Sequence, residues 1–142
     1  MYDTILIPTD GSTSAMRGAE HGVDLAAELD ATVHTLFVIE EATNPWNRES
    51  LEGQMDDAEA YGKNQTQEVA DMGEEVGVEV VQETEIGPNI PKEIMEYADE
   101  EDIDAIVMGS AFRGSLGGLL GSTAEKVVRV TDLPVMVVSQ NP

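Results

Sequence analysis

The stretch YDTILIPTDGS, residues 2–12, decides how this chain folds. Its first half, Tyr2–Ile7, is an apolar run typical of a β-strand. Its second half, Pro8–Ser12, contains the Asp, Gly and Ser that let a strand turn into a helix. Apolar residues then recur at helical spacing from Ser14 to about Leu29, and a run rich in β-branched residues follows at Thr32–Ile39. This order predicts two parallel strands joined by a right-handed crossover.

The rest of the chain continues this alternation without an internal repeat or a linker. A long polar helix is expected over about Ser50–Glu75, and Gly62 marks a candidate break in it. Later strands are predicted at Val78–Thr84, Asp104–Met108 and Pro134–Ser139, and later helices at Ile90–Glu100 and Ser122–Thr131. We therefore predict one α/β domain over residues 1–142, with helices on both faces of an open parallel five-stranded sheet of the Rossmann-like type.

The charge balance limits the classes of partner. The 142 residues include 29 acidic and seven basic ones, a net charge of −22. Nucleic-acid binding is not expected, because the cations that neutralise phosphates are scarce. Such a surface stays soluble when salt screens its charges, which predicts a halophilic protein in a high-salt cytosol; an ordinary acidic cytosolic protein is the alternative.

Two absences in the sequence narrow the class further. There is no Cys, which excludes disulfides and thiolate metal sites. No apolar run reaches the roughly 18–20 residues of a membrane span, and the N-terminus lacks a signal-peptide pattern. We expect a cytoplasmic protein without membrane partners.

Two loops that follow apolar strands carry the candidate binding residues. The first is Pro8–Ser12, and the second is Gly109–Ser122, which contains five of the chain's 13 glycines. If the two strands are neighbours in a parallel sheet, both loops open at the edge where such folds bind ligands. Glycine amides and a following helix amino terminus suit phosphates. Arg113, Lys126 and Arg129 are three of only seven basic residues, so we predict a site for a nucleotide-sized anion.

Other interpretations of these loops are open or excluded. Ser122–Glu125 reads equally as a helix capping box, with the nearby basic residues solvated. A Walker A loop would need Lys where Ser115 stands, and the dinucleotide fingerprint would need more than one glycine in the first loop. A phosphatase-type aspartyl nucleophile would need Asp where Pro8 stands. His21 and His34 are isolated, and structural roles are expected for both.

The same segments resemble the universal stress protein family. The matching motifs are ILIPTDGS at 5–12, FVIE at 37–40, the Gly-Pro turn before Ile90–Ala98, DIDAIVMGS at 102–110, LLGSTAEKV at 119–127 and DLPVMVV at 132–138. The resemblance extends over the whole chain except residues about 41–75, and its motifs are specific.

The resemblance implies a strand order of 3-2-1-4-5, related to the adenine nucleotide alpha hydrolase-like fold, and a homodimer. It also implies ATP, with or without Mg²⁺, between the first and fourth strands. Asp10 and Val38 would then contact adenine or ribose, with Pro8 and Thr9 beside them. The ribose and phosphates would be held by Gly109, Gly121, Ser122 and Thr123, and the candidate set is completed by Met108, Arg113 and Gly114.

The second loop departs from the pattern G-x2-G-x9-G-[S/T] of ATP-binding members. Phe112 occupies the second glycine position, and eight residues rather than nine separate it from Gly121. Gly114 is the candidate replacement. Two functions therefore stay open, an ATP-binding stress or signalling module and a universal stress protein that acts without ATP through dimerisation and protein contacts. No general base stands out, so at most slow ATP hydrolysis is expected.

The last strand predicts the dimer contact. Val135, Met136, Val137 and Val138 form an apolar run that would lie at the edge of the sheet. Proteins normally cover or pair such an edge. We expect this strand to pair with its counterpart across a two-fold axis, and we also expect an additional, unidentified protein partner.

Overall fold

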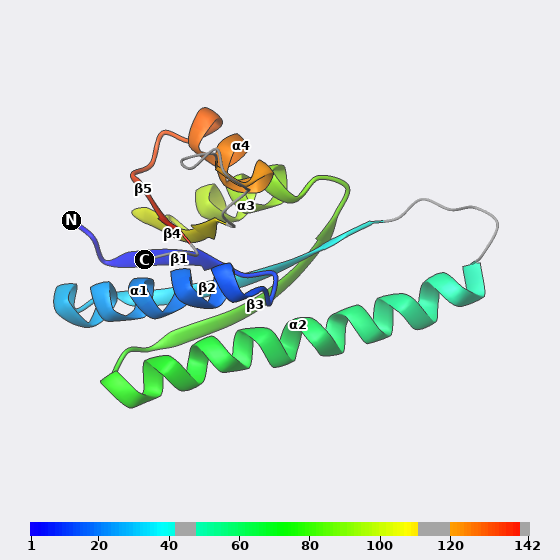
Figure 1. Ribbon diagram of the computed structural model, residues 1–142, viewed down its shortest axis with the longest axis horizontal. Coiled ribbons are helices and arrows are strands. Elements are labelled where there is room, and N and C mark those ends of the chain that lie inside the picture. The colour runs from blue at the N-terminus through cyan, green and yellow to red at the C-terminus, as the bar shows by residue number, and fades with distance from the viewer. Residues whose placement is uncertain (42–47, 111–119, 140–142) are drawn as a thin grey trace.

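The computed structural model describes residues 1–41, 48–110 and 120–139 (Figure 1). Strands and helices alternate from β1 (Thr4–Pro8) through α1 (Thr13–Leu29), β2 (Thr32–Glu40), α2 (Arg48–Val76), β3 (Val80–Gly87), α3 (Ile90–Glu100), β4 (Ala105–Ser110) and α4 (Ser122–Val130) to β5 (Val135–Ser139). The strands form one parallel sheet in the order β3-β2-β1-β4-β5. The predicted fold class is confirmed.

Helices cover both faces of this sheet, as Figure 1 shows for α2 below it and for α3 and α4 above it. One core cluster joins α1 and α2 to the sheet through Ile5, Ile7, Ala19, Val23, Val33, Val69 and Val107. The other joins α3 and α4 to the opposite face through Leu6, Leu36, Ile94, Tyr97, Ile106, Ala124 and Val127. Alternate residues of β1 therefore serve the two cores, as the two-residue period of a strand requires.

Two predictions around α2 are wrong for identifiable reasons, and the third strand also ends later than predicted, at Gly87 rather than at Thr84. The third strand begins at Val80 rather than at Val78, because the Val78 amide donates to the Gly73 carbonyl at 2.8 Å and still belongs to the end of α2. The long helix is not broken at Gly62. That glycine packs against Phe37 of β2, and a Cβ there would lie 2.7 Å from the Phe37 ring.

The register of β1 opens a crevice at the switch point of the sheet. β1 pairs with β2 along its whole length, from Thr4 to Pro8. It pairs with β4 only through Ile5 and Leu6. Since β1 continues to Pro8 and β4 to Ser110, the two strands separate toward their carboxyl ends. Open α/β sheets bind ligands at such a point.

In the described ranges, none of the helices is both long and apolar enough to cross a membrane.

Candidate functional site

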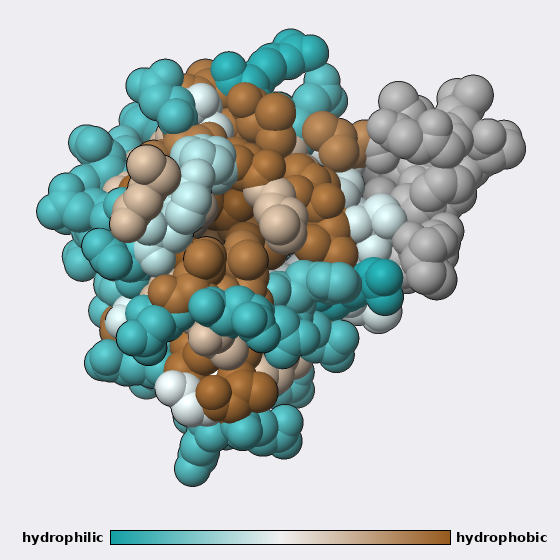
Figure 2. All heavy atoms as spheres, turned by 90° about the vertical axis from the view of Figure 1, so that its left-hand side faces the viewer, coloured by the Kyte–Doolittle hydropathy of each residue, from teal (hydrophilic) through white to brown (hydrophobic). Residues whose placement is uncertain are grey.

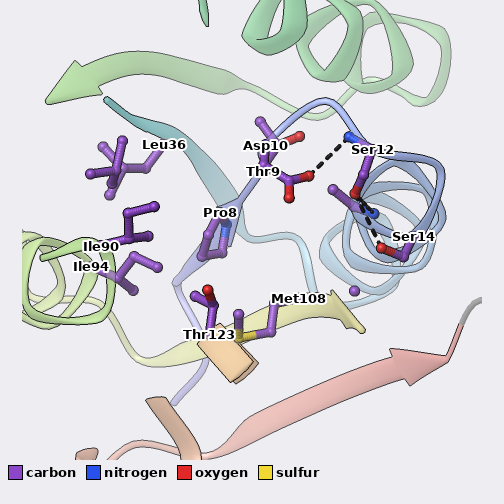
Figure 3. Close-up of a pocket in the computed structure, with 13 residues that line it drawn as sticks. Pro8, Thr9, Asp10, Ser12, Ser14, Leu36, Ile90, Ile94, Met108 and Thr123 are labelled. Atoms are coloured by element: carbon purple, nitrogen blue, oxygen red, sulfur yellow. Dashed lines mark hydrogen bonds between the residues drawn. The ribbon is translucent and has the colours of Figure 1, made fainter. Parts of the chain in front are cut away.

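A cleft of about 540 Å³ lies where β1 and β4 separate (Figure 3). It is lined by Pro8, Thr9, Asp10, Ser12, Ser14, Ala15, Leu36, Val38, Ile90, Ile94, Met108, Gly109 and Thr123. These residues come from three strands, the first loop and the amino ends of three helices.

The floor of the cleft is the end of β1. Thr9 is only 6% exposed, and its amide donates to the Leu36 carbonyl at 2.9 Å, which extends the sheet pairing past Pro8. The Thr9 hydroxyl accepts from the Gly11 amide at 3.2 Å. Gly11 has φ +81°, a conformation that favours glycine. These bonds fix the direction in which the first loop leaves the sheet.

The first loop places Asp10 and two hydroxyls at the amino end of α1. Asp10 Oδ1 accepts from the Ser12 amide at 2.9 Å. Ser12 is the N-cap, because its hydroxyl accepts from the Ala15 amide at 3.2 Å. The Ser12 and Ser14 hydroxyls lie 3.1 Å apart, and Figure 3 shows this polar side of the cleft opposite Ile90 and Ile94.

The opposite wall is apolar. Leu36 and Val38 project from the same face of β2, and Ile90 and Ile94 lie one turn apart on α3. Asn89 sets the start of α3, because its side chain accepts from the Lys92 amide at 3.1 Å. An apolar slot facing hydroxyls and a carboxylate can hold a flat apolar ring and a polyhydroxylated group side by side.

Packing requires a residue without a side chain at position 109. A Cβ at this position would overlap the Ser14 carbonyl and lie 2.9 Å from the Ala15 nitrogen. The end of β4 therefore touches the backbone of the first turn of α1. This close approach gives Gly109 a structural role that does not depend on a bound phosphate.

The start of α4 differs from the predicted capping box. Gly121, rather than Ser122, is the N-cap, and no side chain bonds at that cap. The Gly121 amide donates to the hydroxyl of the buried Ser110 at 2.7 Å, which holds Gly121 in the cap position. Ser122 is therefore the first helical residue, and Thr123 is the residue of α4 that lines the cleft.

The structure brings together most of the predicted site. The predicted site residues that line the cleft are Pro8, Thr9, Asp10, Val38, Met108, Gly109 and Thr123. Gly121 and Ser122 are not among its lining residues. Arg113, Gly114 and Phe112 lie outside the described residues. Sequence reasoning missed Ser12, Ser14, Ala15, Leu36, Ile90 and Ile94 as lining residues.

The other basic residues of the predicted anion cluster lie elsewhere. Arg129 donates to Glu125 Oε1 at 2.8 Å on the exposed side of α4. Lys126 lines a separate groove between α3 and α4. Of the described residues that line the cleft, Asp10 alone carries a charge. His34 is also outside the cleft, and its Nδ1 lies 2.7 Å from the Tyr97 hydroxyl.

No metal cluster is preformed in the part of the chain that the structure describes, since it contains no suitable group of three His, Cys, Asp or Glu side chains. Mg²⁺ bound with a nucleotide does not need one, because phosphates and waters supply most of its ligands and one carboxylate can suffice. Asp10 is the carboxylate that the described lining offers.

Comparison with known proteins relates the whole described fold to one family. The model of the "Universal stress protein family" matches residues 1–139. The universal stress protein MJ0531 of Methanocaldococcus jannaschii is 36% identical over 146 residues, which cover 99% of this chain and 84% of that protein. The solved structure of MJ0577 from the same organism superposes with a TM-score of 0.84 at 29% identity, covering 100% of this chain and 99% of that one.

Two more distant structures share the fold and were solved as complexes. A universal stress protein in complex with cAMP has a TM-score of 0.72 at 22% identity, covering 99% of this chain and 98% of that one. One from Archaeoglobus fulgidus in complex with dAMP has a TM-score of 0.68 at 18% identity, covering 96% and 98%. From the family match over residues 1–139 and the similarity to MJ0531, this chain belongs to the universal stress protein family.

Proposed function

We propose that the cleft binds an adenine nucleotide, with ATP as the ligand, and that the chain is a nucleotide-binding stress or signalling module. One observation carries this proposal. The cleft opens between the carboxyl ends of β1 and β4, with an apolar slot on one side and hydroxyls and a carboxylate on the other. Adenine and ribose present the same two kinds of surface.

The predicted site residues divide into a base-and-ribose half and a phosphate half. Val38, with Pro8 and Thr9, faces the base in this proposal, and the Asp10 carboxylate accepts from a ribose hydroxyl. Met108 and Gly109 lie where the ribose and the first phosphate meet the sheet edge. The remaining phosphates are assigned to Thr123, Gly121, Ser122, Arg113 and Gly114 at the amino end of α4 and in the loop before it.

Two observations support an adenine nucleotide in particular. Proteins of this fold have been solved with cAMP and with dAMP, both of which contain adenine, a sugar and one phosphate. The charge pattern of the described lining also suits the nucleoside half better than a bare anion, because its single charge is the Asp10 carboxylate. When ATP is bound with Mg²⁺, the metal would neutralise part of the phosphate charge, with phosphates and waters supplying most of its ligands.

Binding rather than catalysis is the function that these residues support. A phosphoryl-transfer enzyme needs a positioned nucleophile or a general base. Asp10 is the one ionisable side chain in the described lining, and its Oδ1 already accepts from the Ser12 amide. We therefore propose slow ATP hydrolysis at most.

Isothermal titration with ATP in concentrated KCl, with and without Mg²⁺, tests this function. We expect a saturable signal that weakens about tenfold or more in Asp10→Ala, since a hydrogen bond to a charged group contributes roughly 1.5–3 kcal/mol. Asp24→Ala is the matched control, because Asp24 is an exposed carboxylate on α1 that does not line the cleft. No heat at millimolar ATP would favour the universal stress protein that acts without ATP.

We propose that β5 mediates a homodimer. β5 is the last strand of the sheet, and Met136 on it is 46% exposed. A groove of about 750 Å³ beside it is lined largely by apolar residues that include Leu25, Leu29 and Val135. Figure 2 shows that hydrophobic residues gather on the side of the molecule where Figure 1 places the start of β5.

In this dimer Val135, Met136, Val137 and Val138 pair with the same residues of a second copy. An exposed apolar edge strand is a template for such pairing. Light scattering in concentrated KCl should give twice the monomer mass, and Met136→Lys should reduce it. A monomeric mass for the unmodified chain would refute the dimer.

The predicted salt adaptation and cytoplasmic location also belong to this proposal. A net charge of −22 repels itself most strongly when few ions screen it. Thermal unfolding followed from low to multimolar KCl should show stability rising with salt. Greatest stability at low salt would contradict a high-salt cytosol.

A further inference from the structure

A groove between α3 and α4 concentrates positive charge on this acidic chain. Figure 1 shows the two helices side by side on one face of the sheet. The groove measures about 660 Å³ and is lined by Asn89, Pro91, Lys92, Met95, Lys126 and Val130. Two of the seven basic residues of the chain therefore border one surface depression.

The acidic residues of these helices do not neutralise both lysines. Glu125 is held by Arg129 at 2.8 Å, and the Glu93 carboxylate lies against Gly87. Lys92 is 3.8 Å from Glu96, a long contact between two largely exposed side chains. Lys126 has no carboxylate within 4.0 Å in the described part of the chain. Within the described part of the chain, the ammonium group of Lys126 is thus without an ion pair, and that of Lys92 has this one exposed pair.

The rest of the groove is apolar. Pro91 and Met95 are half-buried on α3, and Val130 is 66% exposed at the end of α4. The methylene stems of the two lysines add further apolar surface. An occupant therefore meets ammonium groups and an apolar strip within one depression.

We propose that this groove docks an acidic segment of a partner protein. Carboxylates of the segment would face Lys92 and Lys126, and an apolar side chain beside them would lie on Met95 and Val130. Charge complementarity selects this occupant. The surface as a whole repels an acidic segment, so such a segment finds its attractive contacts where the lysines gather.

The groove and the proposed nucleotide cleft are lined from the same two helices, α3 and α4. The first turn of α3 carries Ile90 in the cleft and Lys92 in the groove. The first turns of α4 likewise carry Thr123 in the cleft and Lys126 in the groove. A docked segment would therefore rest on the two helices that also line the cleft.

A displayed library of random peptides, selected on the full chain at the lowest KCl concentration at which it is folded, tests the proposal. We expect enrichment of peptides with Asp or Glu beside Leu, Ile or Phe. Individual selected peptides should bind Lys126→Glu about tenfold more weakly. They should bind Lys63→Glu as they bind the unmodified chain, because Lys63 is exposed on α2 and the charge change is the same.

A second variant, and tests for two alternative occupants of the groove, distinguish the possible outcomes. Val130→Ser removes apolar contact from an exposed position and should also weaken the selected peptides, while thermal unfolding shows whether each variant is folded. The absence of acidic peptides, or equal binding to Lys126→Glu, would overturn the proposal. A fall in oligomer mass in Lys126→Glu would instead assign the groove to a second copy, and displacement of the peptides by inorganic phosphate would assign it to a free anion.

Discussion

The contact between Gly109 and α1 gives a prediction that separates packing from ligand binding. In Gly109→Ala, the new methyl would overlap the Ser14 carbonyl and lie 2.9 Å from the Ala15 nitrogen. Both atoms belong to helix backbone, so neither can rotate away, and α1 or β4 must shift. Overpacking of a core lowers stability by roughly 1–3 kcal/mol. We expect the upper end here, about 3 kcal/mol, because backbone meets backbone.

For a domain of this size the loss corresponds to a fall of roughly 6–12 °C in Tm. Thermal and denaturant unfolding without nucleotide, in concentrated KCl, measures it. Gly53→Ala is the control: Gly53 lies in α2, a Cβ there meets nothing within 4 Å, and the same substitution should raise stability by up to about 1 kcal/mol. If Gly109→Ala unfolds like the unmodified chain and loses only nucleotide affinity, the packing argument is wrong.

Three further substitutions test other parts of the fold. Tyr97→Phe removes the hydroxyl that lies 2.7 Å from His34 Nδ1, and should lower the free energy of unfolding by about 1 kcal/mol, while Tyr61→Phe, at an exposed ring, should leave it unchanged. Burial and neighbouring carboxylates raise the pKa of Glu85 in the folded chain. The Glu85 carboxyl therefore ionises at a lower pH in the unfolded chain than in the folded one, and its negative charge lowers the free energy of unfolding at neutral pH. Glu85→Gln should therefore raise the denaturant midpoint at pH 7 and lose this gain as the pH falls below the usual carboxyl pKa; a gain that persists in acid would contradict the assignment. Asp30→Gly should increase stability by about 0.5–1 kcal/mol, because Asp30 caps α1 with φ 56°, and an unchanged Tm would argue against strain there.

The fold could be predicted because local and global patterns agree along most of the chain. The first loop is an example: Asp10, Gly11 and Ser12 have turn and capping chemistry that needs no distant partner. The helix break predicted at Gly62 is absent because of a tertiary contact. Gly62 would be expected to interrupt a polar helix, but the Phe37 ring requires a residue without a side chain at that point.

The site residues at or near the end of a strand could be predicted from the sequence. Those that reach the cleft only because a helix packs over the sheet could not. Leu36 could have been inferred, since it lies two residues before Val38 and shares its face of β2. Ile90 and Ile94 could not, because only the position of α3 over the sheet turns them toward β1. The cap of α4 also depends on a long-range contact, the bond from the Gly121 amide to Ser110.

A crystal structure grown with ATP in concentrated KCl would show whether the cleft binds the nucleotide. We expect the nucleotide between the carboxyl ends of β1 and β4, with its base against Val38 and its ribose beside Asp10. An empty cleft at saturating ATP, or a nucleotide bound at another surface, would contradict it.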